Sequence, residues 1–167
     1  VDKVYVVDTP ELMDFKIESY TAAFEAYINK VKPSAILVGA TSVGRQLAPR
    51  IAARFKTGLT ADCTILDMHE NTDLVQIRPA FGGNIVATIV NPENRPQMAT
   101  VRSGVMQKAI YEGKAKGEVV YPEVAKYVPT TDFVVKVIDR HVEAAKHNLK
   151  GAAIVVAGGY GVGSKEG

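Results

Sequence analysis

The chain has 167 residues, 47% of them hydrophobic and 23% charged, with a formal net charge of +2. This length suits one domain with a sizeable core, and the composition is that of a globular protein. The apolar runs fall short of the roughly 20 residues needed to cross a bilayer, and the dispersed charge lacks the basic footprint of a nucleic-acid-binding protein. We therefore expect no membrane insertion and no nucleic-acid partner. The single cysteine, Cys63, cannot form an intrachain disulfide, which fits a reducing compartment.

The first 39 residues predict a βαβ unit. Residues 4–7 form a β-branched run that ends at the turn Asp8-Thr9-Pro10, as a short strand does. Residues 35–39 form an apolar run that is typical of a strand buried on both faces of a parallel sheet. Between them, apolar side chains recur at helical spacing and predict a helix that ends before Pro33: Tyr20, Ala23, Phe24, Tyr27, Ile28 and Val31. The crossover should be right-handed.

Residues 39–45 form a loop of small residues that leads into a second helix, whose apolar stripe is Leu47, Ile51 and Phe55. Thr41 or Ser42 is expected to cap this helix, and Pro49 to bend it or delay its start. A strand-loop-helix junction exposes free N–H groups to any nearby phosphate. A phosphate-binding loop and a purely structural turn both remain open here.

The middle of the chain predicts strands with little helix. Residues 61–67 resemble a strand, and residues 74–80 and 84–90 are joined by Phe81-Gly82-Gly83, which predicts an antiparallel hairpin. A further strand at residues 98–101 would complete a meander over residues 62–102 and carry the chain to a sheet edge. Arg102 would then lie at a strand end, where ligands bind in open α/β sheets.

The last third of the chain begins with a segment that is more polar than the strands before it. Residues 107–131 are expected to be a surface connector, followed by a strand at 133–139 and a short helical or turning segment around Val142, Ala145 and Leu149. A strand at 152–157 should lead into the glycine-rich loop at 158–163. Because no element follows this loop and the chain does not begin with Met, we expect a piece of a longer protein.

These elements predict an α/β fold: a three-layer, open, mostly parallel sheet with helices on both faces and an antiparallel hairpin or meander extension, similar to nucleotide-binding folds. No catalytic residue is predicted. His69, His141 and His147 are dispersed, so no metal site is expected, and the sequence contains neither a nucleophile elbow nor a Walker loop. Asp62 would raise the pKa of the Cys63 thiol, so we interpret Cys63 as a buried small hydrophobe. Any chemistry would need a cofactor.

Three sequence blocks resemble the α subunit of electron transfer flavoproteins: Thr57-Gly58-Leu59-Thr60-Ala61-Asp62-Cys63-Thr64, Arg78-Pro79-Ala80-Phe81-Gly82-Gly83-Asn84 and Arg95-Pro96-Gln97-Met98-Ala99-Thr100-Val101-Arg102. The likeness continues in Gly39-Ala40-Thr41, Gly44-Arg45 and Leu47-Ala48-Pro49-Arg50, and it resumes at residues 154–167. The sequence looks like the bacterial branch that includes electron-bifurcating and nitrogen-fixation-linked proteins. A bacterial cytoplasmic location follows from this resemblance.

The resemblance implies a heterodimer with a β subunit. Such a protein carries electrons between NADH, bound through the β subunit, or an acyl-CoA-type dehydrogenase and an acceptor, with flavin-based bifurcation as one variant. Residues 1–151 would be the N-terminal α/β domain, and residues 152–167 the first strand and glycine-rich loop of an absent C-terminal FAD-binding domain. One FAD would lie mainly in that absent domain, and a second FAD or an AMP in the partner β subunit.

The resemblance also implies the site residues. The family's arginine that matches Arg102 reaches across the interface to the flavin N5 of the partner-held FAD, where a permanently charged guanidinium favours an electron-rich flavin. Gly159, Tyr160 and Gly161 would belong to the phosphate loop of the missing FAD domain. Two positions depart from the family: Ser103 stands where Pro is common, and Tyr160 where Arg is usual.

Two other functions remain open from the sequence. The chain could be a stand-alone adenine-nucleotide-binding module that uses residues 39–44. Alternatively, it could be a purely structural interface subunit whose arginines form interfacial ion pairs. Under the flavoprotein interpretation it would be an electron carrier or a bifurcating subunit without catalytic residues of its own.

Overall fold

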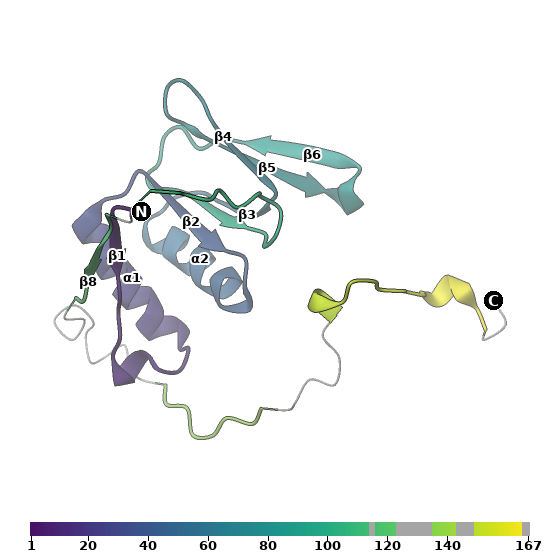
Figure 1. Cartoon of the computed structure of the whole chain (residues 1–167), viewed down its shortest axis with the longest axis horizontal. Helices are drawn as coiled ribbons and strands as arrows, with labels where there is room; N and C mark the ends of the chain where they lie inside the picture. The colour runs from purple at the N-terminus through teal and green to yellow at the C-terminus, as the bar shows by residue number, and fades with distance from the viewer. Residues whose placement is uncertain (114–115, 123–134, 143–148, 165–167) are drawn as a thin grey trace. The chain divides into compact units, whose positions relative to one another are not determined.

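The computed structural model describes residues 1–113, 116–122, 135–142 and 149–164. The chain divides into two units, Val1–Lys136 and Val137–Gly167, and each is described by itself. The first unit contains parallel sheets flanked by helices and a separate antiparallel sheet (Figure 1). This architecture confirms the predicted α/β class with an antiparallel extension.

The main parallel sheet consists of β2 (Ala35–Gly39), β7 (Gln97–Val101) and β3 (Leu59–Cys63), in the order β2-β7-β3. β7 lies between its two neighbours, so that Met98 pairs with Ile36 on one side and with Leu59 on the other. The prediction that residues 98–101 complete a meander over residues 62–102 was therefore wrong. The completely buried Met98 and Ala99 suit a central strand, and nothing local in the sequence shows that the chain returns between two earlier strands.

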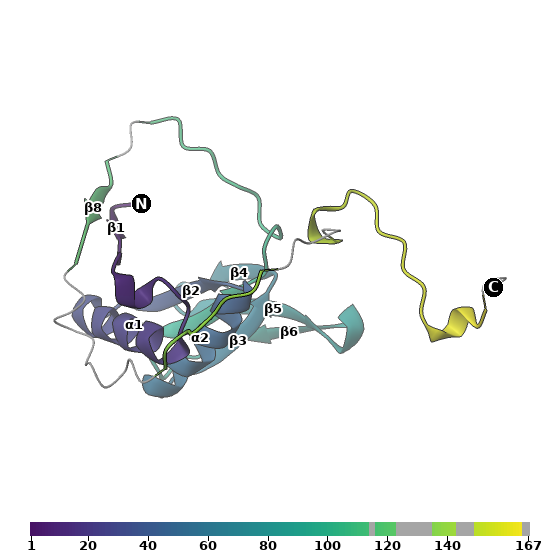
Figure 2. The same ribbon diagram turned by 90° about the horizontal axis from the view of Figure 1, so that it is seen from below.

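Two helices pack against each other and against this sheet (Figure 2). They are α1 (Ile17–Val31) and α2 (Ser42–Arg54), and α1 ends before Pro33 as predicted. Thr41 caps α2, because its Oγ1 accepts a hydrogen bond from the Gly44 N–H at 3.1 Å. Pro49 lies inside α2 and does not delay its start. The shared core consists of Ile28, Leu47, Ile51, Ala52 and Met98.

β2 is less buried than its apolar sequence predicts. Ile36 packs against the cluster beneath the helices, whereas Leu37 on the opposite face is 54% exposed. The expectation of a strand buried on both faces was wrong for the part of the chain that the structure describes, since α1 and α2 cover the face that bears Ile36.

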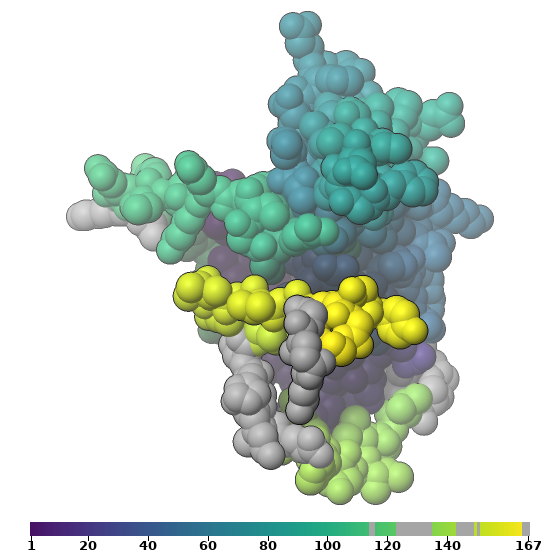
Figure 3. Space-filling view, turned by 90° about the vertical axis from the view of Figure 1, so that its right-hand side faces the viewer, coloured from purple at the N-terminus to yellow at the C-terminus, as the bar shows by residue number. Residues whose placement is uncertain are grey.

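The antiparallel sheet contains β4 (Ile65–Met68), β5 (Leu74–Ala80) and β6 (Ile85–Ile89), in the order β4-β5-β6. A single 3-10 turn, Phe81–Gly83, joins β5 to β6, which confirms the predicted hairpin. Gly82 and Gly83 have φ values of 71° and 93°, which favour glycine. The hairpin of β5 and β6 extends away from the parallel sheet (Figure 2), and its teal tip faces the viewer in Figure 3.

A short two-stranded parallel sheet pairs β1 (Lys3–Tyr5) with β8 (Glu118–Val120). The expected surface connector was therefore wrong at residues 118–120. The β-branched Val119 and Val120 find a ladder partner that is more than 110 residues away in the sequence, which local patterns do not reveal. Residues 114, 115 and 123–131 of that segment lie outside the described residues.

The second unit is described at residues 137–142 and 149–164, and these residues contain no strand. The strand predicted at 152–157 is not found, and neither is the described part of the one predicted at 133–139, since none of these residues pairs in a ladder with another described residue. Residues 133, 134 and 143–148 lie outside the description. Short 3-10 turns occur at Leu149–Gly151 and Tyr160–Val162. The domain boundary after residue 151 stays a prediction.

Candidate functional site

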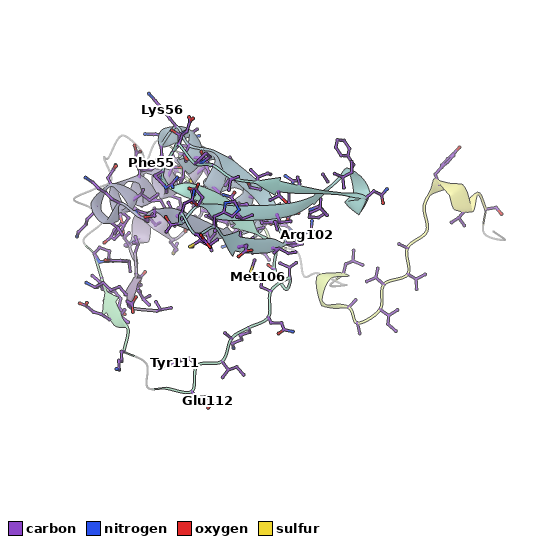
Figure 4. The ribbon with its side chains drawn as sticks, turned by 90° about the horizontal axis from the view of Figure 1, so that it is seen from above. Phe55, Lys56, Arg102, Met106, Tyr111 and Glu112 are labelled. Atoms are coloured by element: carbon purple, nitrogen blue, oxygen red, sulfur yellow. The ribbon has the colours of Figure 1, made fainter. Side chains whose placement is uncertain are left out.

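The carboxyl ends of β2, β3 and β7 meet at one edge of the parallel sheet. Arg102 directly follows β7 there, and α2 begins from the loop that follows β2. Figure 4 shows Arg102 at the opposite end of this layer from Phe55 and Lys56, which follow the last turn of α2. Open α/β sheets usually bind ligands outside the carboxyl ends of their strands. The structure thus places Arg102 where the sequence predicted it, at a strand end.

One aspartate holds two arginines at this edge. Oδ2 of Asp62 accepts hydrogen bonds from Arg102 Nε at 3.2 Å and from Arg102 Nη2 at 2.5 Å. The other oxygen, Oδ1, accepts from Arg45 Nη2 at 2.9 Å. Arg45 also donates from Nε to the carbonyl oxygen of Ala40 at 3.0 Å. We call Arg45, Asp62 and Arg102 the Asp62 cluster.

A bulge in β3 aims Asp62 at the arginines. Ala61 and Asp62 together lie opposite the single residue Thr100, because Thr60 pairs with Ala99 and Cys63 pairs with Val101. Asp62 has a φ of 64°, and its N–H donates to Oγ1 of the buried Thr100 at 2.7 Å. Bulges of this kind redirect a side chain out of the regular alternation of a strand.

Electrostatics keep the Asp62 cluster ionised. The hydrogen bond from Arg102 lowers the pKa of Asp62, burial partly opposes this, and the charges of Arg102, Arg45 and Arg78 lower the pKa further. The hydrogen bond to Asp62 in turn raises the pKa of Arg102. Three cations therefore act on one carboxylate, which leaves an excess of positive charge at this edge.

Part of the positive charge at this sheet edge is accessible to a ligand. The Arg102 side chain is 48% exposed, and its Nη1 has no hydrogen-bond partner among the residues that the structure describes. The side chain of Arg78 on β5 likewise has no hydrogen bond or ion pair within the described chain. A guanidinium edge with free donors suits an anionic or electron-rich acceptor, so the residues present fit the edge of a flavin.

The loop at residues 39–44 has few free donors for a phosphate. Ala40 N–H donates to Val101 O and Thr41 N–H to Gly39 O, both at 2.8 Å, while Gly44 N–H is occupied by the Thr41 cap. A Cβ on Gly44 would lie 2.0 Å from the Gly39 carbonyl oxygen, so the turn is tightly closed. These contacts give the loop a structural role, and the N–H groups of Ser42 and Val43 at the start of α2 have no partner among the described residues.

Arg95 begins the sequence block that ends at Arg102, and it belongs to a separate polar cluster. Its Nη2 donates to Asp73 Oδ1 at 2.8 Å, and its Nη1 donates to backbone carbonyls that include Asn91 O at 3.0 Å. Burial disfavours the Asp73 anion, but the hydrogen bonds from Arg95 and Asn71 outweigh burial, so the pKa of Asp73 is lowered. This cluster fixes the entry to β7.

Cys63 is completely buried, which confirms the interpretation as a small core residue. Burial raises the pKa of its thiol, and the charge of Asp62 adds to that increase. No group of histidine, cysteine, aspartate and glutamate side chains that could hold a metal ion occurs within the described ranges. No helix in those ranges is long and apolar enough to span a membrane.

The predicted phosphate loop lies in the second unit. Tyr160 begins a 3-10 turn and is fully exposed, and the Gly159 carbonyl accepts a hydrogen bond from the Val162 N–H at 3.1 Å. A Cβ on Gly159 or Gly161 would meet no atom within 4 Å. Their role as a phosphate loop stays a prediction.

The first unit also contains an apolar cavity of about 390 Å³ between β1 and α1. Its lining carries no charged side chain, so it offers none of the cationic chemistry of the Asp62 cluster. The lining residues are Tyr5, Val7, Leu12, Tyr20, Ala23, Phe24 and Tyr27.

A family profile described as the electron transfer flavoprotein domain matches residues 1–127. The chain belongs to the electron transfer flavoprotein family. This membership implies a flavin cofactor.

Individual members of the electron transfer flavoprotein family match nearly the whole chain. Subunit LctC of the lactate dehydrogenase (NAD(+),ferredoxin) of Acetobacterium woodii is 54% identical over 164 residues, which cover 97% of this chain and 38% of the relative. The electron transfer flavoprotein subunit alpha of Thermoanaerobacterium thermosaccharolyticum is 48% identical, covering 99% of this chain and 50% of the relative. Protein FixB of Clostridium saccharobutylicum is 47% identical, with coverages of 99% and 49%. The chain thus spans half the length of these relatives or less.

Sequence reasoning identified Arg102 but missed both of its neighbours in the Asp62 cluster. From the sequence, Asp62 is considered only for its effect on Cys63, and Arg45 only as part of a sequence block. The strand predicted at residues 61–67 puts Asp62 near its amino end, whereas β3 ends one residue after Asp62. Because the carboxyl ends of parallel strands converge, the meeting of Asp62 and Arg45 follows only from the observed bounds of β3.

Proposed function

We propose that this chain is part of an electron transfer flavoprotein α subunit that pairs with a β subunit and passes electrons between a dehydrogenase and an acceptor. The family membership and the relatives named as α subunits support this proposal. The relative named lactate dehydrogenase (NAD(+),ferredoxin) subunit LctC supports the variant in which NADH is a reactant and bifurcation occurs. We place the protein in the bacterial cytoplasm, as its bacterial relatives suggest.

The proposed cofactor is FAD. One FAD would be bound mainly by a part of the protein beyond this chain, with Gly159, Tyr160 and Gly161 contributing to its phosphate loop. A second FAD or an AMP would lie in the β subunit, where FAD would present its N5 edge to Arg102. A bound flavin supplies the chemistry of accepting and releasing electrons one or two at a time.

The single observation that carries this proposal is the half-exposed Arg102 with its open Nη1 at the end of β7. The guanidinium stays protonated, and its pKa is raised further by Asp62. A fixed cation beside a flavin favours the electron-rich reduced form, because the attraction grows as negative charge develops. The role of Arg102 would be to orient the flavin edge and raise its reduction potential.

The test uses the complete heterodimer with both subunits and bound FAD. We expect Arg102→Ala to lower the reduction potential of the β-subunit flavin, measured by potentiometric titration followed by absorbance. Arg54→Ala is a matched control, because Arg54 is also half exposed and paired, with Glu25 at 2.9 Å, but lies in the last turn of α2. An unchanged flavin potential in the Arg102→Ala heterodimer would contradict the proposed role.

A further inference from the structure

We propose that Asp62 is the positioning residue for Arg102: it holds one edge of the guanidinium so that the other edge faces the flavin, while Arg45 keeps the carboxylate paired. This inference rests on the proposed function, since it assumes that Arg102 meets a flavin. It concerns a residue pair that acts through Arg102 and does not itself touch the cofactor.

The first support is the rigidity of Asp62. The bulge gives Asp62 a φ of 64°, and its N–H is tied to Thr100, which is 2% exposed. The backbone of Arg102 is fixed to the same segment, because its N–H donates to the carbonyl oxygen of Cys63 at 3.0 Å. The carboxylate and the start of the Arg102 side chain are therefore held in one frame, which limits the directions that the guanidinium can take.

The second support is the way in which Arg102 uses its donors. Nε and Nη2, which form one edge of the guanidinium, both donate to Asp62 Oδ2. Nη1 lies on the other side of the planar group and has no hydrogen-bond partner in the described part of the chain. Because guanidinium is planar, fixing the Nε and Nη2 edge also fixes the direction in which Nη1 can donate.

The third support is the role left to Arg45. Arg45 occupies Oδ1 of Asp62 at 2.9 Å and is itself anchored on Ala40 O at 3.0 Å. If Arg102 tilts toward a ligand, Asp62 keeps Arg45 as a cationic partner. The tilt therefore does not leave an unpaired carboxylate at a site where Asp62 is only 17% exposed. The cluster can therefore present Arg102 and still remain paired.

The test compares Asp62→Asn with the wild-type heterodimer, again through the potential of the β-subunit flavin. Simple loss of a negative charge would raise that potential, because the remaining field becomes more positive. Loss of positioning predicts the opposite sign: the potential falls toward the value of Arg102→Ala. We expect the fall. A potential that rises or stays unchanged in Asp62→Asn would overturn the inference.

A double variant decides whether Asp62 acts through Arg102. In the Arg102→Ala background, Asp62→Asn should no longer lower the potential. A further fall of the same size in the double variant would show that Asp62 acts independently and would overturn the inference. Asp8→Asn is the matched control, because Asp8 is exposed and should leave the potential unchanged.

A second variant covers the case in which Asp62→Asn fails to fold or to pair. Asp62→Glu keeps the charge but moves the carboxylate outward by one methylene group, so it should displace Arg102 and give a partial fall in potential. Wild-type potential in Asp62→Glu would contradict the need for this geometry. The two failures are distinguishable: no shift in Arg102→Ala rejects the proposed function, whereas a shift in Arg102→Ala without one in the Asp62 variants rejects only the positioning role.

Discussion

The N–H of Arg102 donates to the carbonyl oxygen of Cys63 at 3.0 Å, so the strand end that carries the exposed cation is bonded to the backbone of a completely buried residue. The bond extends the contact between β7 and β3 by one residue beyond Val101. The exposed part of the site thus lies directly on the core. A substitution in the core near Cys63 should therefore shift Arg102, and a substitution at Arg102 should alter the packing near Cys63.

The Cys63 thiol should resist modification in the folded chain. It is completely buried, and burial raises its pKa, so little thiolate is present at neutral pH. We expect a thiol-specific disulfide reagent at pH 7.5 to react at least about 100-fold more slowly than with the chain unfolded in urea, since reaction requires opening of the core. Rapid labelling of one thiol per folded chain would contradict the buried position.

Asp62→Asn should change the pH dependence of stability. The folded pKa of Asp62 is lowered from its ordinary value of 3.8, so its contribution is present above that value and is lost as the pH falls through the lower folded pKa. We expect the variant to be less stable than wild type at pH 7 by about 1 kcal/mol, and the difference to shrink toward pH 2. Urea unfolding across this pH range measures it. A difference for Asp62→Asn that is constant with pH would argue against the ion pairs.

Gly44→Ala should be strongly destabilising. A Cβ at this position would lie 2.0 Å from the backbone oxygen of Gly39, which cannot move without disturbing β2 and the start of α2. We expect a loss of about 3 kcal/mol in the free energy of unfolding, at the upper end for overpacking. Gly39→Ala is the control in the same loop, since its Cβ would meet only Thr41 Cγ2 at 4.0 Å. Equal stability of the two variants would show that the turn is looser than described.

Gln97→Leu should lower the free energy of unfolding, because it leaves a buried backbone group unpaired. Gln97 is 1% exposed; its Oε1 accepts from the Leu74 N–H at 2.8 Å, and its Nε2 donates to Asn91 O at 2.8 Å. Leucine matches the size but leaves the Leu74 N–H without this acceptor, while Asn91 O keeps its hydrogen bond from Arg95 Nη1, so we expect a loss of about 1 to 3 kcal/mol in urea unfolding. Gln46→Leu, on the exposed face of α2, should change stability by less than about 0.5 kcal/mol. A near-neutral Gln97→Leu would mean that water replaces these bonds.

The parts of the fold that depend on local signals were predictable. The spacing of apolar residues located α1, Thr41 was identified as a candidate cap for α2, and the glycines at residues 82 and 83 marked the hairpin turn. These features depend on contacts between residues close in sequence, where helix periodicity and turn chemistry decide the structure.

The parts that depend on distant pairing were not predictable. β7 enters between β2 and β3, and β1 pairs with β8 across most of the first unit. Neither pairing can be recognised from the sequences of the strands themselves. The same limit applies to the site: Arg102 was identified by its place after a strand, but its carboxylate partner becomes visible only once β3 and β7 lie side by side.

The bulge in β3 makes the number of residues in this strand as important as their identity. Thr60 and Cys63 are three positions apart and would face opposite sides of a regular strand, yet both are buried, because the extra residue restores their common side. Deleting Ala61 would remove the bulge and leave Thr60 and Cys63 two positions apart in a regular strand, so both would keep their buried side. Asp62 would then be an ordinary strand residue and would lose the φ of 64° that goes with the bulge. Chains that keep an aspartate here but lack the extra residue would therefore retain the buried pattern and lose the backbone turn that directs the carboxylate toward the arginines.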